Sequence, residues 1–317
     1  EGGGAGGGGW AGARGEGGAG VGCVVVAGAG HWRFGRARGA AHGRVGLHAR
    51  MAEGEDALPV ALRLDDEARM ASLAAALLHD LGHGPFSHLF EEVSPGARHH
   101  EAWTLDILRD PGTEVHRALE LLSAGMADRV TSLLSGTYRI PYLARAVSGA
   151  LDVDRADYLL RDSHMTGVRY GLYDLDWLLR ALAFGAIEVD GREEWVLAVE
   201  GRKGLPPIEG FFLARHFMFQ QVYHHKATRA AEALIRGLFV RVGELVRDGG
   251  TPEATPAALI SAARGAPVSL GDYLELDDVA LLHCFARWEQ SDDPALAELS
   301  SRLRARRLPK TVPLPSD

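Results

Sequence analysis

A histidine and an aspartate stand side by side at the end of an apolar, alanine-rich stretch, and two more histidines follow closely. These residues are His79 and Asp80, then His83 and His88. Imidazole and carboxylate groups are the ligands that divalent metals take in hydrolytic sites. A carboxylate at a helix C-terminus is disfavoured by the helix dipole and is costly to bury alone, and a bound cation would remove both penalties. The pair therefore indicates a metal site, with capping and local hydrogen bonding as the alternative interpretation.

The segment that precedes the pair has the spacing of an amphipathic helix. Apolar side chains recur at helical intervals through residues 70–81. Gly82 and Gly84-Pro85 follow, and such residues are typical of a helix end. We therefore expect a helix that carries His79 and Asp80 on its last turn. Its expected buried face consists of Met70, Leu73, Ala74, Leu77, Leu78 and Leu81.

A second segment rich in potential ligands lies at residues 142–163. Asp154, Tyr158 and Asp162 are spaced four apart, so one face of a helix would present all three. The alternative is that the acids of this segment form a solvated face. Apolar neighbours such as Leu159 favour a half-buried helix instead.

Composition limits the classes of protein to consider. The chain has 317 residues and a net charge of −8, which argues against nucleic-acid binding as its main role. Two cysteines are too few for a disulfide framework, and this fits a reducing cytoplasm. No apolar run of about eighteen residues predicts a membrane span, and no secretory leader is visible. We therefore expect a cytoplasmic protein that does not enter a membrane.

Residues 1–30 differ from the rest of the chain. The first fifty residues hold 19 of the 40 glycines and only two acids, Glu1 and Glu16. Such a tract buries too little to offset its ordering entropy, so we predict poor order through residue 30. An alternative is that this stretch is eroded or wrongly translated relative to its ancestor.

The remaining pattern predicts a mainly α fold with one small β-hairpin. The hairpin is expected at residues 187–199, around an Asp-Gly turn. Pro206-Pro207 is expected to end that unit, and one long helix, either straight or kinked, should follow from about Glu209 to Val246. We predict a core at 31–246 and a C-terminal segment at 247–317. That segment has a linker at Pro252 to Pro256, a helical pair at 274–307 and a Pro-rich tail. The other helices are expected at 61–81, 115–135 and 142–163.

Four ordered motifs carry a resemblance to a known family. They are LLHDLGHGPFSH at 77–88, HHE at 99–101, LDVDRADYLLRDS at 151–163, and the run from Ala214-Arg215 to Lys226. Together they resemble the HD-domain phosphohydrolase superfamily, with the greatest likeness to deoxynucleoside triphosphate triphosphohydrolases of the bacterial dGTPase and animal SAM-and-HD-domain types. The likeness extends from about Ala27 to Leu303 and implies an HD-domain helical bundle.

The resemblance implies a metal site, and this sequence differs from the family pattern at one of its ligands. His79, Asp80 and Asp154 correspond to three metal ligands of the family. The fourth belongs to an H-x-R-F-x-H motif, which His31-x-Arg33-Phe34 matches, but Arg36 stands where the second histidine is expected. A guanidinium has no lone pair to donate to a metal. Either a neighbour such as His42 replaces it, or metal affinity is weakened, or the N-terminal sequence is not faithful.

The resemblance also implies roles for the other site residues. The catalytic group for water activation or leaving-group protonation would be His83, His88, Glu91 and His100. The residues implied in substrate binding are Arg33, Arg155, Tyr158, Asp162, Arg215 and Lys226. The implied cofactor is a divalent metal (Mn, Mg, Fe, Zn or Ni), the implied substrate a deoxynucleoside triphosphate, and the products deoxynucleoside and triphosphate. A homo-oligomer is expected from the same resemblance.

Two other functions remain open from the sequence. One is hydrolysis of a different nucleotide phosphoester by the same HD-domain chemistry, although Arg155 and Arg215 favour a polyphosphate. The other is a catalytically weakened nucleotide-binding protein, for which Arg36 is the main support.

Overall fold

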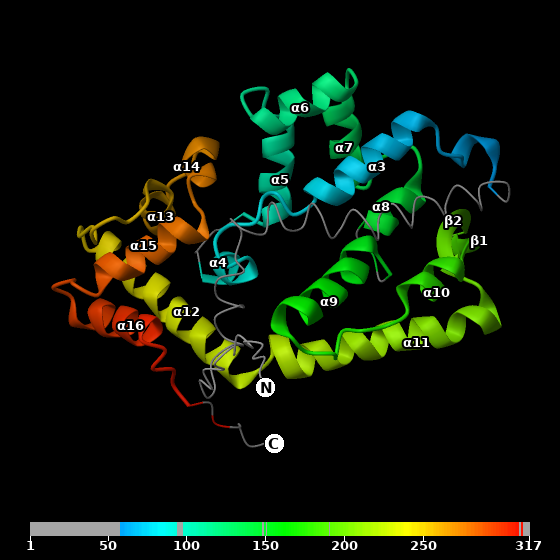
Figure 1. The fold of residues 1–317 in the computed structure, drawn as a ribbon. Helices are drawn as coiled ribbons and strands as arrows, with labels where there is room; N and C mark the ends of the chain where they lie inside the picture. The colour runs from blue at the N-terminus through cyan, green and yellow to red at the C-terminus, as the bar shows by residue number, and fades with distance from the viewer. Residues whose placement is uncertain are drawn as a thin grey trace, which may run out of the picture.

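A computed structural model of the chain describes residues 58–93, 98–147, 149, 151–189, 191–310 and 312. The described part is built from helices and a single two-stranded sheet, so the expected mainly α fold with one hairpin is confirmed (Figure 1). The predictions for residues 1–30 and for His31, Arg33, Arg36 and His42 lie outside the described residues. No described helix is both long and apolar enough to cross a bilayer.

The elements follow one another along the chain in the order that Figure 1 labels. They are η2 Val60–Leu62, α3 Asp66–Leu78, α4 His88–Val93, α5 His100–Arg109, α6 Glu114–Leu122, α7 Met126–Leu134, α8 Pro141–Val147, α9 Val153–Thr166, α10 Leu175–Arg180, β1 Leu182–Val189, β2 Arg192–Val199, α11 Gly201–Met218, η3 Phe219–Tyr223, α12 Lys226–Arg247, α13 Ala257–Ala263, α14 Leu270–Leu274, α15 Asp278–Trp288 and α16 Pro294–Arg304.

Helix α3 ends at Leu78, so the His-Asp pair directly follows its last turn and does not lie on it as predicted. The expected buried face of the helix is also wrong. Asp65 caps the helix by accepting a hydrogen bond from the Ala68 N–H at 2.7 Å. The side chains that face the core are small: Ala68, Ala71, Ser72, Ala75 and Ala76. Met70 and Leu77 are instead 37% and 46% exposed. Small side chains on the inner face let α7 and α8 pack closely against α3, and spacing alone did not distinguish this alanine face from the leucine face.

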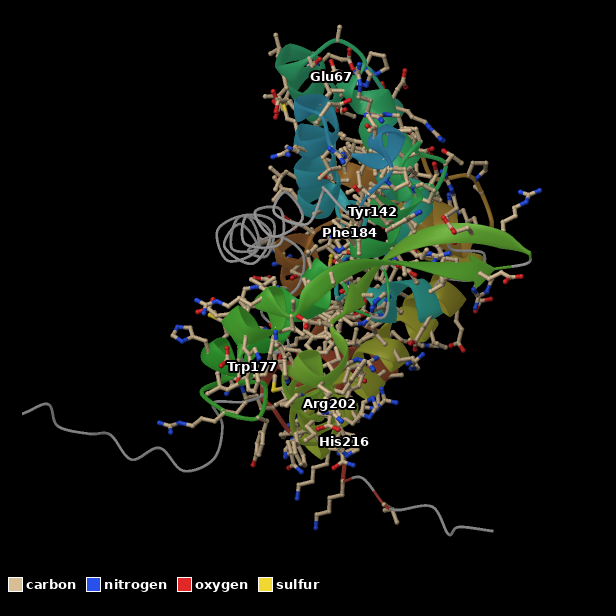
Figure 2. All side chains as sticks on the ribbon, turned by 90° about the vertical axis from the view of Figure 1, so that its right-hand side faces the viewer. Glu67, Tyr142, Trp177, Phe184, Arg202 and His216 are labelled. Atoms are coloured by element: carbon tan, nitrogen blue, oxygen red, sulfur yellow. The ribbon has the colours of Figure 1, made fainter. Side chains whose placement is uncertain are left out.

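The first hydrophobic cluster joins α3 to α7 and α8 and extends to the hairpin. Tyr142 of α8 is fully buried there, and its ring lies 5.0 Å from that of Phe184 on β1 (Figure 2). The strands pair antiparallel with Ala186 opposite Trp195, and Leu182 pairs with Val199. The hairpin therefore begins five residues before the predicted start at Ile187, since the earlier part of β1 pairs along the whole of β2.

Helices α9, α10 and α11 form a second packed group around Leu159, Leu178 and Phe211. Helix α11 begins at Gly201, so Pro206 and Pro207 lie inside its first turns and do not end the preceding unit as predicted. The expected single helix to Val246 is interrupted by the π turn η3 and resumes as α12. π turns inside helices are frequent at functional sites.

The C-terminal helices complete the fold on one side of the molecule (Figure 1). Helices α13 and α16 pack on α12, and α15 packs on α16. Their cluster also includes Phe90 and Trp103 from α4 and α5. The predicted helical pair corresponds to α15 and α16. Helices α13 and α14 precede them, in a stretch from which no helix was predicted. The C-terminal helices therefore pack against α4 and α5, which carry part of the predicted site.

Candidate functional site

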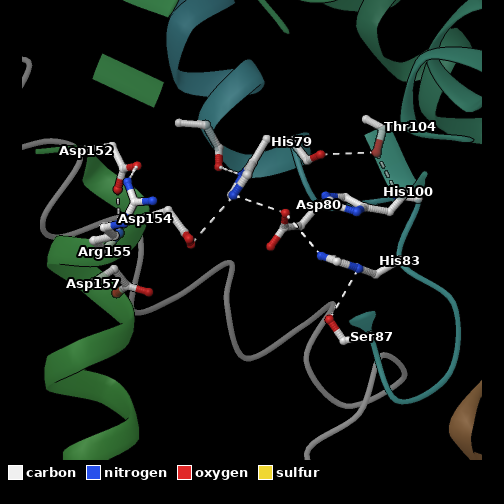
Figure 3. Close-up of polar contacts among 12 residues, drawn as sticks. His79, Asp80, His83, Ser87, His100, Thr104, Asp152, Asp154, Arg155 and Asp157 are labelled. Carbon is white, nitrogen blue, oxygen red and sulfur yellow. Dashed lines mark hydrogen bonds and ion pairs between the residues drawn. The ribbon is translucent and has the colours of Figure 1, made fainter. Parts of the chain in front are cut away.

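His79, Asp80 and Asp154 come together between the end of α3 and the start of α9 (Figure 3). The Nε2 atom of His79 lies 3.3 Å from Oδ1 of Asp80 and 3.6 Å from Oδ1 of Asp154. The other ring nitrogen, Nδ1, donates a hydrogen bond to the Ala76 carbonyl at 2.9 Å. That bond fixes the ring orientation and directs Nε2 toward the two carboxylates.

The donor set fits a divalent metal ion. Ligand atoms held about 2.0–2.2 Å from a tetrahedral metal stand about 3.3–3.6 Å from each other, which matches the spacing of the His79 and carboxylate atoms. Burial lowers the pKa of His79, but the hydrogen bond to Asp154 and the charges of Asp80 and Asp154 outweigh it, so the pKa lies above its usual value. Two carboxylates thus favour a positive charge at this nitrogen, and a metal would provide one in place of the proton.

Asp154 is held in place by the cap of α9. The buried carboxylate of Asp152 accepts hydrogen bonds from the backbone N–H groups of Arg155 at 2.7 Å and Gly149 at 2.9 Å. The guanidinium of Arg155 also donates to Asp152, at 2.6 Å. Asp154 is therefore in the first turn of a well-capped helix, where its charge also benefits from the helix dipole.

A second cluster contains His83, His88, Glu91 and His100. The rings of His83 and His100 stack at 3.8 Å, and His88 packs edge-on against His83 at 4.8 Å. His100 donates from Nδ1 to Glu91 Oε1 at 2.7 Å, and its backbone N–H donates to the same oxygen at 3.2 Å. The four residues chosen from the sequence are thus brought together by the turn after α3, by α4 and by α5.

His83 and Glu91 of this second cluster have pKa values shifted by their surroundings. Burial lowers the pKa of His83, and the nearby His100 and His88 add to that effect, although Asp80 opposes it. Burial raises the pKa of Glu91, but His100 outweighs this and leaves the pKa below its usual value. At neutral pH His83 is a neutral base and Glu91 is an ionised acceptor.

Asp80 connects the two clusters. Its Oδ1 atom lies 3.5 Å from His83 Nε2 as well as 3.3 Å from His79 Nε2. The histidine that can take a proton is therefore adjacent to the site that can hold a metal (Figure 3).

The residues predicted to bind substrate are only partly brought together. Tyr158 is hydrogen bonded to Arg215, and Arg215 Cζ lies 5.1 Å from the Phe219 ring in η3. The Arg215 Nε atom is buried and has no hydrogen-bond partner within the described part of the chain. Asp162 accepts a hydrogen bond from the Tyr223 hydroxyl at 2.8 Å. These contacts join α9 to α11 and η3.

Two of the cations predicted to bind substrate are paired elsewhere or exposed. Arg155 is paired with Asp152, as described above, and stays about one-third exposed. Lys226 is the first residue of α12 and is exposed. Arg33 lies outside the described residues.

Comparison with known proteins agrees with the geometry. The family model of the HD domain matches residues 44–162, a range that includes both His clusters and the metal-ligand candidates. A phosphohydrolase structure from Bacteroides thetaiotaomicron superposes with a TM-score of 0.71 and 28% sequence identity, covering 87% of this chain and 65% of that chain. This chain contains an HD domain and is similar to HD-domain phosphohydrolases.

Curated proteins are also similar in sequence to this HD-domain chain. The protein YwfO of Bacillus subtilis is 36% identical over 244 residues, which cover 77% of this chain and 53% of YwfO. The deoxynucleoside triphosphate triphosphohydrolase SAMHD1 of Danio rerio is 26% identical over 273 residues, covering 75% of this chain and 41% of that protein. The HD-domain chain thus spans about half the length of the curated relatives it matches.

One residue that supports the site of this HD-domain chain was not predicted from sequence patterns. Thr104 on α5 accepts a hydrogen bond from the Gly82 N–H at 2.9 Å and donates to the His79 carbonyl at 3.1 Å. A β-carbon on Gly82 would lie 2.1 Å from the His100 carbonyl oxygen, so only glycine fits there. A threonine inside a helix carries no motif, and its role depends on this close approach.

The turn of the HD-domain chain between His83 and His88 contains backbone strain. Phe86 and Ser87 both have left-handed conformations, with φ of 58° and 57°. Such residues cost of order 1–3 kcal/mol each and persist where surrounding contacts hold them. The Ser87 hydroxyl lies 3.2 Å from His83 Nδ1, so the strained turn brings a polar group to the ring of the central histidine.

Proposed function

We propose that this chain is a metal-dependent phosphohydrolase that acts on deoxynucleoside triphosphates and releases deoxynucleoside and triphosphate. The observation that carries the proposal is the convergence of His79, Asp80 and Asp154, with His83 against the same aspartate. A metal-ligand triad beside a neutral imidazole is suited to hydrolysis at phosphorus. The substrate class is supported by the names of the SAMHD1 relatives and by the cation and tyrosine next to the site.

His79, Asp80 and Asp154 would hold the metal. When bound, it would polarise a phosphoryl oxygen and lower the pKa of water. Nε2 of His79 is presented for this by the Nδ1–H bond to Ala76, which fixes the tautomer of the neutral ring.

Proton transfer is assigned to the second cluster. His83 is uncharged at neutral pH, so its ring can accept a proton from the attacking water. Glu91 holds the Nδ1–H of His100, which leaves Nε2 of His100 available for proton exchange. His88, whose ring packs edge-on against His83, is assigned to the leaving oxygen as proton donor.

Substrate binding is assigned to the side of the site formed by α9, α11 and η3. The guanidinium of Arg215 lies beside Tyr158 and Phe219, and its planar set of donors suits phosphate oxygens. Tyr158 and Asp162 would contact the sugar, with Asp162 oriented by the Tyr223 hydroxyl. Arg155 and Lys226 are assigned to the outer phosphates.

The test is a product analysis on the purified chain with Mn²⁺ or Mg²⁺. Each of the four deoxynucleoside triphosphates is supplied, and triphosphate and deoxynucleoside are quantified by chromatography. We expect equal amounts of both products, and loss of turnover in Asp154→Ala. Release of single phosphate or pyrophosphate, or turnover of dGMP in place of dGTP, would instead support an HD phosphohydrolase for another phosphoester. Nucleotide binding with no turnover and no bound metal would support the weakened protein that Arg36 suggests.

A further inference from the structure

Two side chains from the C-terminal helices reach the turn that carries His83. Tyr273, at the end of α14, donates a hydrogen bond from its hydroxyl to the Gly82 carbonyl at 2.7 Å. Asp278, the first residue of α15, accepts a hydrogen bond from the Phe86 N–H at 3.1 Å. The two bonded peptide groups lie on either side of His83 in the sequence. We infer that Tyr273 and Asp278 are positioning residues that hold the His83 turn in its active conformation, an inference that rests on the proposed function.

Tyr273 is itself tightly held. Its side chain is buried, and its ring stacks on Trp103 of α5 at 3.9 Å with only 6° between the planes. A β-carbon on Gly84 would lie 3.1 Å from the Tyr273 hydroxyl and 2.8 Å from Phe90, so the turn lies directly against these rings. The hydroxyl therefore has little freedom, and the Gly82 carbonyl is fixed to a rigid aromatic group.

Gly82 is bound on both sides of its backbone. Its N–H donates to Thr104 of α5, and its carbonyl accepts from Tyr273 of α14. Thr104 also binds the His79 carbonyl, so the same small network includes the backbone of a candidate metal ligand. Loss of the Tyr273 hydroxyl would leave a buried carbonyl without this partner.

Asp278 binds the strained part of the turn. Phe86 and Ser87 are successive left-handed residues, and Asp278 binds the N–H of the first of them. Asp278 is 4% exposed, and its Oδ2 atom has no hydrogen-bond partner in the described part of the chain. A buried carboxyl group with one free oxygen is a poor way to stabilise a helix terminus. The hydrogen bond that it accepts from the Phe86 N–H accounts for its position.

In the described part of the chain, the titratable groups next to Asp278 have partners of their own. Asp277, its neighbour, caps α15 by accepting from the Ala280 N–H at 2.7 Å. Phe285 of the same helix stacks on Phe86 at 5.8 Å, and Cys284 is directed to the Ala254 carbonyl. Asp278 is therefore a buried residue whose carboxylate accepts from the turn that carries His83.

The test separates positioning from folding with matched variants of the full chain. Tyr273→Phe removes the hydroxyl and keeps the stack on Trp103. Its control is Tyr142→Phe, because Tyr142 is equally buried and donates to a backbone carbonyl, that of Leu62 at 2.8 Å, away from the site. Asp278→Ala removes the acceptor, and its control is Asp277→Ala, which removes the cap of the same helix. Asp278→Asn keeps an accepting oxygen and should rescue the alanine variant.

Two readouts are needed. In kinetic assays with deoxynucleoside triphosphate and Mn²⁺, we expect kcat to fall about ten- to one-hundred-fold in Tyr273→Phe and Asp278→Ala, with KM changed less than three-fold, since small displacements of catalytic groups have effects of about this size. We expect the two controls and Asp278→Asn to stay within about three-fold of the parent. Equal losses in the controls, or no rescue by asparagine, would overturn the inference.

The second readout does not depend on turnover. Imidazole signals of ¹⁵N-histidine-labelled protein are recorded at one pH, with His83→Gln used for assignment. The signals of His83 and His88 should shift in Tyr273→Phe and Asp278→Ala and stay in place in both controls. Unchanged signals in all four variants would overturn the inference even if the chain hydrolyses nucleotides. Shifted signals in a chain without turnover would support it while contradicting the proposed function.

Discussion

His79 Nε2 lies 3.6 Å from Asp154 Oδ1, although His79 follows the end of α3 and Asp154 lies in α9. The imidazole is fixed by the Ala76 carbonyl and the carboxylate by the capped first turn of α9. Because each side is held by its own helix end, the distance depends on how α3 and α9 pack. The proposed hydrolysis requires that packing.

Removal of Asp154 should abolish metal binding before it affects folding. We expect Asp154→Ala to lower the affinity for Mn²⁺ by at least about 100-fold, since even outer groups around a metal contribute 10- to 100-fold. Isothermal titration and elemental analysis of the purified chain measure this. The matched control is Asp176→Asn, which changes an exposed acid in the first turn of α10. Equal metal content in both variants would contradict the assignment of Asp154.

Glu91 should be needed for proton transfer through His100. Its carboxylate accepts from His100 at 2.7 Å, and Glu91→Gln removes the charge that orients and stabilises that imidazole. We expect kcat to fall about 10²-fold or more, as for loss of an acid–base group. Glu92→Gln is the control, since Glu92 is exposed and its ion pair with Arg236 lies at the surface. Steady-state kinetics with a deoxynucleoside triphosphate should leave this control unchanged.

Gly82 should tolerate no side chain. An added β-carbon would lie 2.1 Å from the His100 carbonyl oxygen and 2.3 Å from the Thr104 nitrogen, both backbone atoms that cannot rotate away. We expect Gly82→Ala to lower the free energy of unfolding by about 3 kcal/mol or more. Gly210 on α11 has nothing within 4 Å of its added β-carbon, so Gly210→Ala should raise stability by about 0.5–1 kcal/mol. Urea unfolding followed by circular dichroism measures both changes, and a stable Gly82→Ala protein would contradict the close packing of α5.

Asp278 should make stability depend on pH. Burial raises its pKa from 3.8 to about 6, although the Phe86 N–H opposes this. The native state therefore binds the proton more tightly than the unfolded chain does. The contribution of Asp278 to stability is complete below pH 4, falls as pH rises to about 6, and is constant above that. Asp278→Asn lacks this titration, so its stability relative to the parent should rise by about 3 kcal/mol from pH 4 to pH 7. Urea midpoints at pH 4, 5, 6 and 7 measure this, and a constant difference would contradict it.

Arg215 should affect substrate binding more than chemistry. Its guanidinium is held near Phe219 and Tyr158, and its Nε–H is unpaired within the described residues. We expect Arg215→Lys to raise KM about ten-fold, because an ammonium cannot reproduce the planar fork that binds phosphate oxygens. Arg202→Lys is the control, because Arg202 is exposed near the start of the same helix (Figure 2). An unchanged KM in Arg215→Lys would remove Arg215 from the binding site.

Sequence patterns by themselves determined the local parts of this protein. Helical periodicity and capping residues such as Asp65 and Asp152 mark where helices begin, since an N-cap satisfies orphan N–H groups from within a few residues. The His-Asp pair at the end of α3, the hairpin and the acidic segment around Asp154 were found in the same way. The roles assigned to their side chains remain predictions.

Tertiary structure decided which of those parts meet. The alanine face of α3 is buried because close helix packing selects small side chains, a choice that periodicity does not contain. Thr104, Tyr273 and Asp278 carry no local signal, because each acts on backbone that is distant in sequence. The 3.6 Å approach of His79 to Asp154 likewise depends on long-range packing of helices, and only the folded chain specifies it.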